Sequence, residues 1–372
     1  MTRAVAYFGT YDPDYPRSAV VIAGLRELGV TVHEVKAPLP PLTAVEMLTP
    51  RGAARLAAAL AAAHLALLAQ LRGRVSVDAL IVGYPGHFVV PLGCAAAALL
   101  HTRLVFDPLV SLTDTFAGDR GLVAEGGWKA RGVRAADRAA FGLPDLVLAD
   151  TRAHAAYYRS VFGLPDRRLA VVPVGALPAP AADGGARRLQ AGEPLRVFQY
   201  GRWSPLHGAE TVVEAASLLR HEPFRFVLAG EGQLSASLRR LIASRQLANV
   251  EWLGFLAPAS LRAQTLAADV CLGVFGRSEK AARVVPNKVY DALSCGRPVI
   301  TADTPGAREI LTDRVNAVLV PTADAESLAG ALRDLLDGGE RTRLGEGALA
   351  LYRGALTPSA VAGTLLAALE EL

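Results

Sequence analysis

The sequence contains little cysteine and little lysine. Its three cysteines, Cys94, Cys271 and Cys295, lie far apart in 372 residues, each among apolar or helix-forming neighbours. This spacing fits neither a disulfide framework nor a zinc site, so a reducing cytosol is expected. Only four of the 39 basic residues are lysines, a bias typical of a GC-rich genome, and two of them, Lys280 and Lys288, lie close together.

Signals of several other protein classes are absent too. The first residues, MTRAVAYFGTY, contain no apolar core, so secretion is not expected. The longest apolar run, residues 53–74, is rich in alanine and interrupted by Arg55 and His64, which predicts a soluble helix. The absence of a basic stripe interleaved with aromatics argues against a nucleic-acid partner. The absence of a G-x-S-x-G motif argues against a serine hydrolase.

The order of apolar segments predicts the fold class. Short apolar runs at residues 3–8, 77–83 and 102–107 alternate with segments of helical periodicity. Strands buried on both faces and separated by helices imply parallel sheets. After about residue 177 this pattern gives way to Pro, Gly and Ala, and it restarts at LRVFQY. The sequence therefore predicts two doubly wound, Rossmann-like α/β domains that face a cleft.

The predicted boundaries follow from these shifts in pattern. The first domain spans residues 1–178, a linker spans 179–194 and the second domain spans 195–356. Residues 357–372 form an amphipathic helix, of a kind that often crosses back to the first domain in two-Rossmann proteins. Because open α/β sheets bind ligands at the carboxyl ends of their strands, chemistry is expected in the loops that follow strands.

Charge is uneven along the chain. The first 180 residues carry 18 Lys and Arg against 14 Asp and Glu, whereas the remainder is balanced. A mildly basic first half is consistent with an anionic ligand or with an acidic membrane face.

Two loops of the second domain combine glycine with polar groups. In GRWSPLHGAET, Gly201 allows a sharp turn, Arg202 offers a planar fork suited to phosphate, and a helix begins near Gly208. The alternative is a capped strand-to-helix turn with a surface arginine. In AGEGQLS, the G-x-G around Glu231 lacks the third glycine of a dinucleotide fingerprint. Its glycines are expected to allow close backbone approach to something in the cleft.

A third loop gathers positive charge ahead of a helix. Three cations precede that helix, at Arg277, Lys280 and Arg283. The helix begins at Pro286 and Asn287 and has Lys288 in its first turn, which predicts an anion site. Asp291 lies on the same helical face, so the ribose and diphosphate of a nucleotide would satisfy both charges. The alternative is a solvated helix start with a local Lys288–Asp291 pair.

These segments occur in an order that resembles a known family. The series YGRWSPLHGAETVVEAASLL, FVLAGEGQL, VEWLGFL, PNKVYDALSCGRPVIT and DTPGAREIL is similar to the donor-nucleotide domain of family-4 (group 1) glycosyltransferases, retaining enzymes of the GT-B fold. PNK at 286–288 resembles a variant of the motif before the ribose-binding carboxylate. The first domain is similar more loosely, through YFGTYDPDYPR, FDPLVSLTDTFAGDR, VLADTRAHAAYY and VVPVGA.

The resemblance implies roles for individual residues. Arg202 matches the arginine that contacts the donor diphosphate, and Asp291 matches the acidic residue that binds the ribose hydroxyls. Phe255 lies in the segment near the nucleobase, and Gly9 matches a glycine loop near the donor phosphates or the acceptor. The nucleotide-sugar site implied in full comprises Gly9, Arg202, His207, Glu231, Phe255, Lys280, Pro286, Asn287, Lys288 and Asp291.

Two positions depart from the family pattern. His207 stands where the family usually has lysine, so one phosphate cation is weaker at neutral pH, since an unperturbed histidine has a pKa of about 6.5. Arg283 stands where the family often has a glutamate, eight residues before Asp291. Lys288, with Lys280, is expected to supply the missing positive charge.

Candidates for catalysis come from the first domain. His87 and Asp107 each follow a predicted strand and are expected to face the cleft, although an isolated histidine is more often structural. Arg17 is expected either to meet an anionic acceptor or to be a surface residue at a helix start. Asp12 and Asp14 match a D-x-D metal motif only superficially, so no metal site is predicted.

The sequence thus predicts a hexosyltransferase-like enzyme that moves a sugar from a UDP-, GDP- or similar nucleotide sugar. The acceptor is a glycan, a lipid-linked molecule or a small molecule, and the anomeric configuration is retained. No metal or cofactor is expected, because fixed cations stabilise the departing diphosphate. The alternatives are a sugar-nucleotide epimerase of the GT-B fold and a noncatalytic nucleotide-sugar-binding subunit. The expected location is the cytoplasm, including the inner face of the cell membrane through the first domain.

Overall fold

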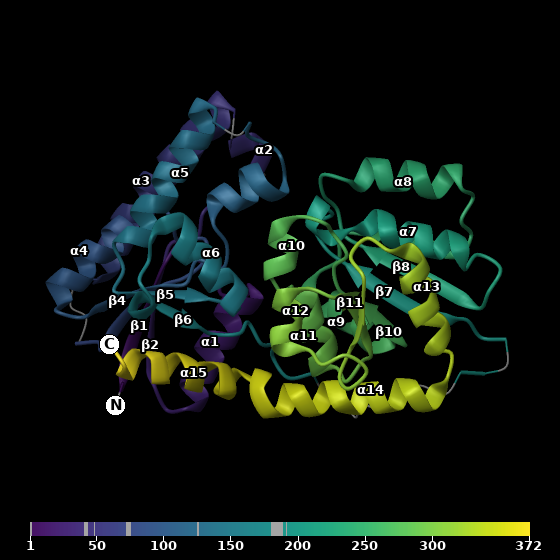
Figure 1. Cartoon of the computed structure of the whole chain (residues 1–372). Coiled ribbons are helices and arrows are strands. Elements are labelled where there is room, and N and C mark those ends of the chain that lie inside the picture. The colour runs from purple at the N-terminus through teal and green to yellow at the C-terminus, as the bar shows by residue number, and fades with distance from the viewer. Residues whose placement is uncertain are drawn as a thin grey trace. The chain divides into compact units, whose positions relative to one another are not determined.

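The computed structural model describes residues 2–40, 44–47, 49–71, 76–124, 126–179, 189–190 and 192–372. The chain forms two compact units: unit 1 is Met1–Val174 with Pro358–Leu372, and unit 2 is Gly175–Thr357. Within the described residues, each unit is built on a six-stranded sheet whose paired strands are all parallel (Figure 1). The predicted α/β class with two doubly wound domains is therefore confirmed. Of the predicted linker, residues 180–188 and 191 lie outside the described residues.

Unit 1 contains a sheet with the strand order β2-β1-β3-β4-β5-β6. Its strands are β1 (Ala4–Gly9), β2 (Thr31–Lys36), β3 (Ala79–Val82), β4 (Arg103–Phe106), β5 (Leu146–Ala149) and β6 (Leu169–Val171). Its helices are α1 (Pro16–Glu27), α2 (Ala44–Met47), α3 (Pro50–Leu71), α4 (Val90–Leu100), α5 (Trp128–Gly142), α6 (Arg152–Phe162) and α15 (Pro358–Glu370), with short π and 3-10 turns at Asp114–Asp119 and Asp166–Arg168. The inner strands β3 and β5 are buried along their whole length, whereas the edge strand β2 is half exposed.

The C-terminal helix belongs to unit 1. Helix α15 packs against α1, and Gly24 on α1 permits their close approach (Figure 1). A Cβ at Gly24 would lie 1.8 Å from the carbonyl oxygen of Pro358, which opens α15. Unit 1 is therefore assembled from two separate stretches of chain, and unit 2 is inserted between them in the sequence.

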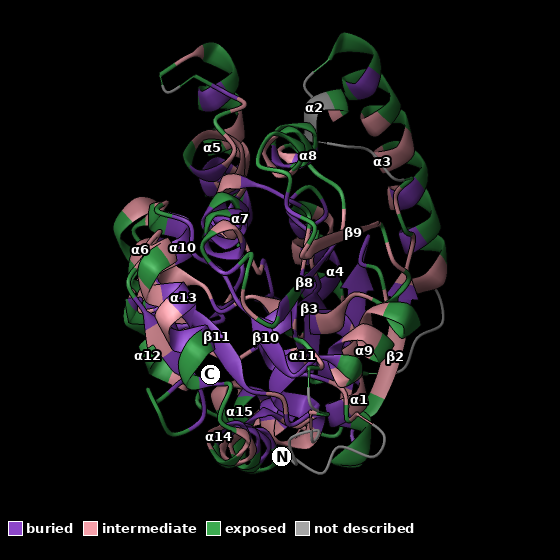
Figure 2. Cartoon of the chain, turned by 90° about the vertical axis from the view of Figure 1, so that its right-hand side faces the viewer, coloured by how far each residue is buried: buried purple, intermediate pink, exposed green. Residues whose placement is uncertain are grey.

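Helix α3 exposes most of its surface. It is 22 residues long and buries Gly52, Ala63 and Leu67. Its most apolar window has a mean hydropathy of 1.6 with 17% of that window buried, so among the described residues it alone is long and apolar enough to cross a membrane. In Figure 2 most of α3 is exposed or intermediate, whereas the sheet strands are largely buried. Unit 1 thus carries an exposed, alanine-rich face.

Unit 2 contains a sheet with the strand order β12-β11-β10-β7-β8-β9. Its strands are β7 (Leu195–Tyr200), β8 (Phe224–Ala229), β9 (Val250–Gly254), β10 (Val270–Leu272), β11 (Val299–Ala302) and β12 (Val318–Val320). Its helices are α7 (Ala209–Leu218), α8 (Ser235–Ser244), α9 (Pro258–Ala267), α10 (Glu279–Arg283), α11 (Asn287–Ser294), α12 (Pro305–Ile310), α13 (Ala325–Asp334) and α14 (Gly338–Leu351), with short turns η3 (Pro205–His207) and η4 (Tyr352–Leu356).

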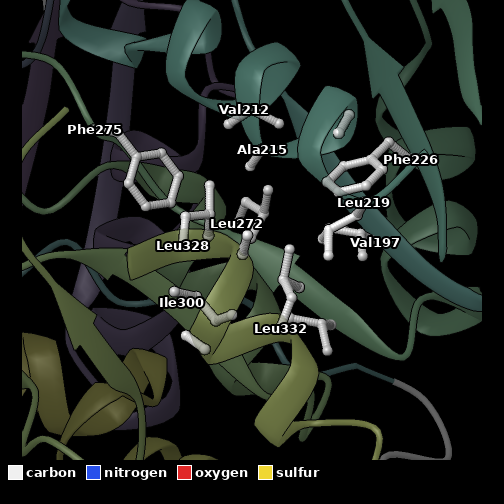
Figure 3. Packing of buried hydrophobic residues seen from close by; sticks show 14 of the residues in the cluster. Val197, Val212, Ala215, Leu219, Phe226, Leu272, Phe275, Ile300, Leu328 and Leu332 are labelled. Carbon is white, nitrogen blue, oxygen red and sulfur yellow. The ribbon is translucent and has the colours of Figure 1, made fainter. Parts of the chain in front are cut away.

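The core of unit 2 lies between the sheet and helices α7 and α13 (Figure 3). Val212 and Ala215 on α7 and Leu328 and Leu332 on α13 recur at helical spacing, so each helix turns one apolar face inward. They meet strand residues such as Leu272. This packing holds the strands of the sheet in place. The loops that follow β7, β8, β9 and β10 extend from the ends of these strands.

Candidate functional site

The switch point of the second sheet lies between β7 and β10. The chain runs from β7 through β8 and β9 on one side and returns on the other side at β10. Gln199, near the end of β7, donates from Nε2 to the carbonyl of Gly273 after β10, at 2.9 Å. The loops after these strands therefore start side by side, at the edge where open α/β sheets bind ligands.

Glycines bring the loops after β7 and β8 into contact. A Cβ on Gly230, whose φ is +125°, would lie 1.9 Å from the Gly201 carbonyl oxygen. A Cβ on Gly232 would lie 2.6 Å from the backbone nitrogen of Trp203. Trp203 is fully buried and donates from Nε1 to the Gly230 carbonyl at 2.9 Å. The sequence predicts that Gly230 and Gly232 allow a group in the cleft to approach the backbone. In the structure, the group that approaches them is the backbone of the neighbouring loop after β7.

Arg202 lies between these contacts and has an exposed side chain. It makes no hydrogen bond or ion pair with the described part of the chain. The guanidinium is therefore available to an anion at the carboxyl edge of the sheet, and both its predicted role and the surface alternative fit this placement.

His207 ends the 3-10 turn η3, and Ser204 orients its ring. The backbone N–H of Ser204 donates to Nδ1 of His207 at 3.3 Å, and the Ser204 hydroxyl lies 3.2 Å from the same atom. Because Nδ1 accepts a backbone hydrogen, the proton of the neutral ring lies on Nε2. His207 therefore presents an N–H donor, where the predicted family pattern has a fixed positive charge.

Lys288 lies in the first turn of α11 and is 6% exposed. Its Nζ has no hydrogen-bond partner among the described residues and lies 5.8 Å and 6.0 Å from the ring centroids of Tyr200 and Trp203. Burial lowers the pKa of Lys288 to about 7. A Cβ on Gly201 would lie 3.1 Å from this Nζ and 2.4 Å from His207 Nε2. Lys288 and His207 therefore converge on the Gly201 backbone.

Asp291, one turn further along α11, is half-buried and accepts a hydrogen bond from the Tyr200 hydroxyl. Burial raises the pKa of Asp291, and the Tyr200 hydrogen bond and the charge of Arg262 partly offset this rise. Burial also raises the pKa of Tyr200, so its hydroxyl stays a donor. No ion pair among the described residues joins Lys288 to Asp291. The alternative of a solvated helix start with a local pair is therefore wrong.

A helix begins at the PNK segment. Pro286 has extended backbone angles, φ −75° and ψ 153°, and Asn287 opens α11. Upstream, α10 contains the buried Lys280, and Arg283 pairs with the exposed Glu279 at 3.2 Å. Arg283 therefore has its charge matched within its own helix.

Two further predicted residues lie after β8 and β9, whose ends are paired. Glu231 is exposed and accepts hydrogen bonds from Arg239 and from the indole N–H of Trp252, the latter at 3.3 Å. Phe255 is 76% exposed. An exposed aromatic ring at a strand end is a surface on which a base can stack.

The predicted residues of unit 1 lie at its own strand ends. Gly9 closes β1 with φ +127°. Arg17 is 1% exposed and donates from Nε to Asp107 Oδ2 at 2.7 Å and from Nη1 to the Val172 and Pro173 carbonyls at 2.9 and 2.7 Å. The expectation of a surface Arg17 is wrong, because buried acceptors surround its guanidinium. Asp107 has a structural partner, and its catalytic role stays a prediction.

His87 follows β3 and is buried. Its Nε2 lies 2.9 Å from the Val110 carbonyl and 3.7 Å from Asp137 Oδ1. Burial lowers the pKa of His87, and the Asp137 charge opposes this shift. Asp137 also accepts hydrogen bonds at 3.0, 3.0 and 2.7 Å from the loop after β4, namely from Ser111 Oγ, Leu112 N and Thr113 N. The catalytic role of His87 likewise stays a prediction.

Sequence reasoning misses three polar groups: Asp137, the Asp150–His154 pair and Tyr200. Asp150 Oδ1 lies 2.6 Å from His154 Nδ1, and both side chains are buried. Asp150 directly follows β5, so a search of strand ends for carboxylates could have found it. Asp137 lies within α5 among exposed basic residues and gives no such signal.

The D-x-D match has a local explanation. Asp12 and Asp14 are exposed and lie in the turn before α1, where the Asp14 backbone N–H donates to Asp12 Oδ1 at 3.0 Å. Over the ranges that the structure describes, no three His, Cys, Asp or Glu side chains gather as a metal site.

A family of known proteins matches part of the second unit. Residues 194–338 match the family described as "Glycosyl transferases group 1". The amylovoran biosynthesis glycosyltransferase AmsK of Erwinia amylovora is 27% identical over 150 residues, 39% of this chain and 37% of its own length. The D-inositol 3-phosphate glycosyltransferase of Xylanimonas cellulosilytica is 31% identical over 226 residues, 56% of this chain and 53% of its own. The matched segments thus span between about a third and about half of these relatives.

Solved structures match the whole chain. HepE of Anabaena, solved in complex with UDP and glucose, has a TM-score of 0.66 at 16% identity and covers 100% of both chains. Sucrose-phosphate synthase of Thermosynechococcus elongatus has a TM-score of 0.71 at 18% identity and covers 98% of both. At these identities the likeness shows the fold alone, and it confirms the predicted GT-B fold class.

Proposed function

We propose that this chain, which has the GT-B fold and a second unit matching the group 1 glycosyltransferases, transfers a sugar from a nucleotide diphosphate sugar to an acceptor. One observation carries the proposal: the buried Nζ of Lys288 and the Nε2–H of His207 converge on Gly201 at the switch point. Buried polar groups normally have hydrogen-bond partners. The Lys288 amine is buried and has no hydrogen-bond partner among the described residues, which favours an anionic ligand at this point.

Each part of the donor has a complementary group in unit 2. The diphosphate accepts hydrogen bonds from Lys288, His207 and Arg202, at a helix start formed by Pro286 and Asn287. Helix α11 adds the positive end of its dipole. Asp291 is proposed to bind the ribose hydroxyls, and Phe255 is proposed to stack on the base. Glu231 and Lys280 complete the proposed donor site.

The transfer step follows from the placement of these charges. The bond from the anomeric carbon to the β-phosphate oxygen breaks, a bond from that carbon to the oxygen of an acceptor hydroxyl forms, and the hydroxyl proton passes to the departing phosphate. Negative charge grows on the departing phosphate, where one well-placed donor is worth about 3 kcal/mol. We further propose that the donor sugar is a hexose and that its anomeric configuration is retained, as the resemblance to the group 1 glycosyltransferases implies. No metal is needed in this proposal, because Lys288 and Arg202 supply positive charge to the diphosphate. Gly9, His87 and Asp107 are proposed for the acceptor side, in unit 1.

Calorimetric titration with UDP, GDP, ADP and dTDP tests the donor site. One nucleotide is expected to bind, and Lys288→Ala and Arg202→Ala are each expected to weaken it tenfold or more, about 1.4 kcal/mol. Arg225→Ala is the matched control, because this exposed arginine is the second residue of β8 and lies at the end of the strand opposite the Gly230 loop. If no nucleotide binds, or if the site variants bind like the control, the proposed donor site is wrong. If a nucleotide does bind, analysis of the products formed from the donor sugar nucleotide alone distinguishes a transferase from an epimerase.

A face of α5 supports contact with an anionic membrane. Trp128, Arg131, Arg134 and Arg138 follow one another at spacings of three, three and four residues, so they share one side of the helix. All four are exposed, Trp128 to 74%. A basic helical face with a tryptophan is typical of a membrane surface contact. We therefore propose a glycan or lipid-linked acceptor at the inner face of the cell membrane.

Sedimentation with phosphatidylglycerol-containing vesicles tests this contact. The double variant Arg131→Gln/Arg138→Gln is expected to reduce the partition coefficient about thirtyfold, because each cation near an anionic surface contributes about 1 kcal/mol. The control double variant, Arg220→Gln/Arg245→Gln, removes two exposed arginines of unit 2. Equal losses in both variants, or equal binding to neutral phosphatidylcholine vesicles, would rule out α5 as the contact.

A further inference from the structure

Among the residues that the structure describes, none accepts a hydrogen bond from the Lys288 amine. An ammonium carries three hydrogen donors, yet Nζ has no hydrogen-bond partner among the described residues. The nearest carboxylate along the helix, Asp291, is already bonded to the Tyr200 hydroxyl. The rings of Tyr200 and Trp203, whose centroids lie 5.8 and 6.0 Å from Nζ, offer only a weak attraction to a cation.

The titratable groups on the neighbouring elements do not compensate this charge. On η3, His207 turns its Nε2–H donor toward the same point as Nζ. On β10 and at the end of α11, burial raises the pKa of the Cys271 thiol and raises that of Cys295 to about 11, so both thiols are neutral. On α9, the Arg262 charge acts on Asp291 and is itself positive. Of these groups, Asp291 alone is a carboxylate, and burial is the cause of the lowered pKa of Lys288.

Removing a charged amine from water without pairing it is costly, so such a group loses its proton instead. Resting on the donor site proposed above, we propose that Lys288 is uncharged in the free protein above neutral pH and takes up one proton when the nucleotide diphosphate binds. The bound diphosphate supplies hydrogen-bond acceptors and negative charge to the Lys288 amine, which has no acceptor among the described residues. Lys288 thus becomes a cation only when a phosphate is present to pair with it.

The direction of the pH dependence follows from linkage. Burial lowers the pKa of Lys288 to about 7 in the free protein, and a bound diphosphate raises it again. Between those two values binding requires a proton, so the apparent Kd should rise about tenfold for each pH unit above about 7. His207 is not the expected site of uptake, because protonation of Nδ1 would break its bond from the Ser204 backbone.

Calorimetry at pH 8 measures the uptake directly. The titration uses UDP, or whichever of the four nucleotide diphosphates binds, in Tris, HEPES and tricine, which differ in ionisation enthalpy. At pH 8 the terminal phosphate, with a second pKa of about 6, is already ionised and needs no proton itself. The slope of observed enthalpy against buffer ionisation enthalpy is expected to give close to one proton taken up. Lys288→Arg, whose guanidinium is always charged, should bind with a slope near zero, whereas His207→Gln should keep the wild-type slope.

The outcomes separate this inference from the proposed function. If no nucleotide binds the wild type, the donor site itself is wrong. If a nucleotide binds with zero slope at pH 8, the donor site stands and the proton uptake is refuted. Uptake that persists in Lys288→Arg and disappears in His207→Gln would also refute it, because His207 would then be the titrating group. Should Lys288→Arg fail to fold, the wild-type Kd between pH 7 and 9 still decides: a constant Kd contradicts the inference.

Discussion

Replacing Arg17 by methionine is expected to lower the unfolding free energy of unit 1 by about 3–5 kcal/mol. The Arg17 guanidinium donates to Asp107 Oδ2 and to the carbonyls of Val172 and Pro173, and it is 1% exposed. Methionine keeps the apolar stem but leaves the Asp107 carboxylate buried without its cation. It also leaves two carbonyls without a donor, at the point where the chain leaves β6.

Hydrogen exchange read peptide by peptide checks this result, because β7 and β8 of unit 2 serve as an internal reference. Arg26→Met is the matched control: it lies on the same helix, but its side chain is 53% exposed and its pair with Glu34 is a surface pair, worth at most about 1 kcal/mol. The double variant Arg17→Met/Asp107→Leu should recover most of the loss, because it removes the stranded charge. If Arg17→Met costs no more than Arg26→Met, the pair does not stabilise unit 1.

The Gly201→Ala variant is expected to weaken nucleotide binding about a hundredfold, which corresponds to about 2.8 kcal/mol. Its Cβ would lie 2.4 Å from His207 Nε2 and 3.1 Å from Lys288 Nζ, so both donors must move away. Moving the His207 ring also strains its bond from Ser204. One methyl group thus disturbs both donors without removing either side chain.

Gly330→Ala is the control for this substitution. A Cβ at Gly330, in α13 of the same unit, would meet nothing within 4 Å, so binding should be unchanged or the helix slightly stabilised. Affinity is measured by calorimetry, and exchange at β7 and β10 verifies that the sheet is intact. Wild-type affinity in Gly201→Ala would mean that the ligand does not contact these two donors.

Much of the fold could be predicted from the sequence because its strands are buried on both faces. The apolar runs at residues 3–8 and 77–83 lie within two residues of β1 and β3. Parallel strands of this kind leave continuous apolar runs between helices, and such a pattern depends on local sequence alone. The start of α11 at Asn287 could also be predicted from local sequence, because proline and asparagine act on the backbone at their own positions.

The environment of each site residue could not be predicted in the same way. Arg17 and Asp107 are 90 residues apart, and no local pattern reports that their side chains meet inside unit 1. Lysine is almost never fully buried, so the burial of Lys288 runs against the prior for its residue type. Gly230 and Gly232 signal close approach, but the sequence does not say that the object approached is the loop at Gly201.

The contact of α15 with α1 has a consequence for the order in which the chain folds during synthesis. Ribosomes release a chain from its N-terminus, and domains generally fold in that order. Here α15, which covers α1 at Gly24, is synthesised after all of unit 2. One face of α1 therefore stays uncovered in the nascent unit 1 until unit 2 has been synthesised. The unit that is translated first is the last to be finished.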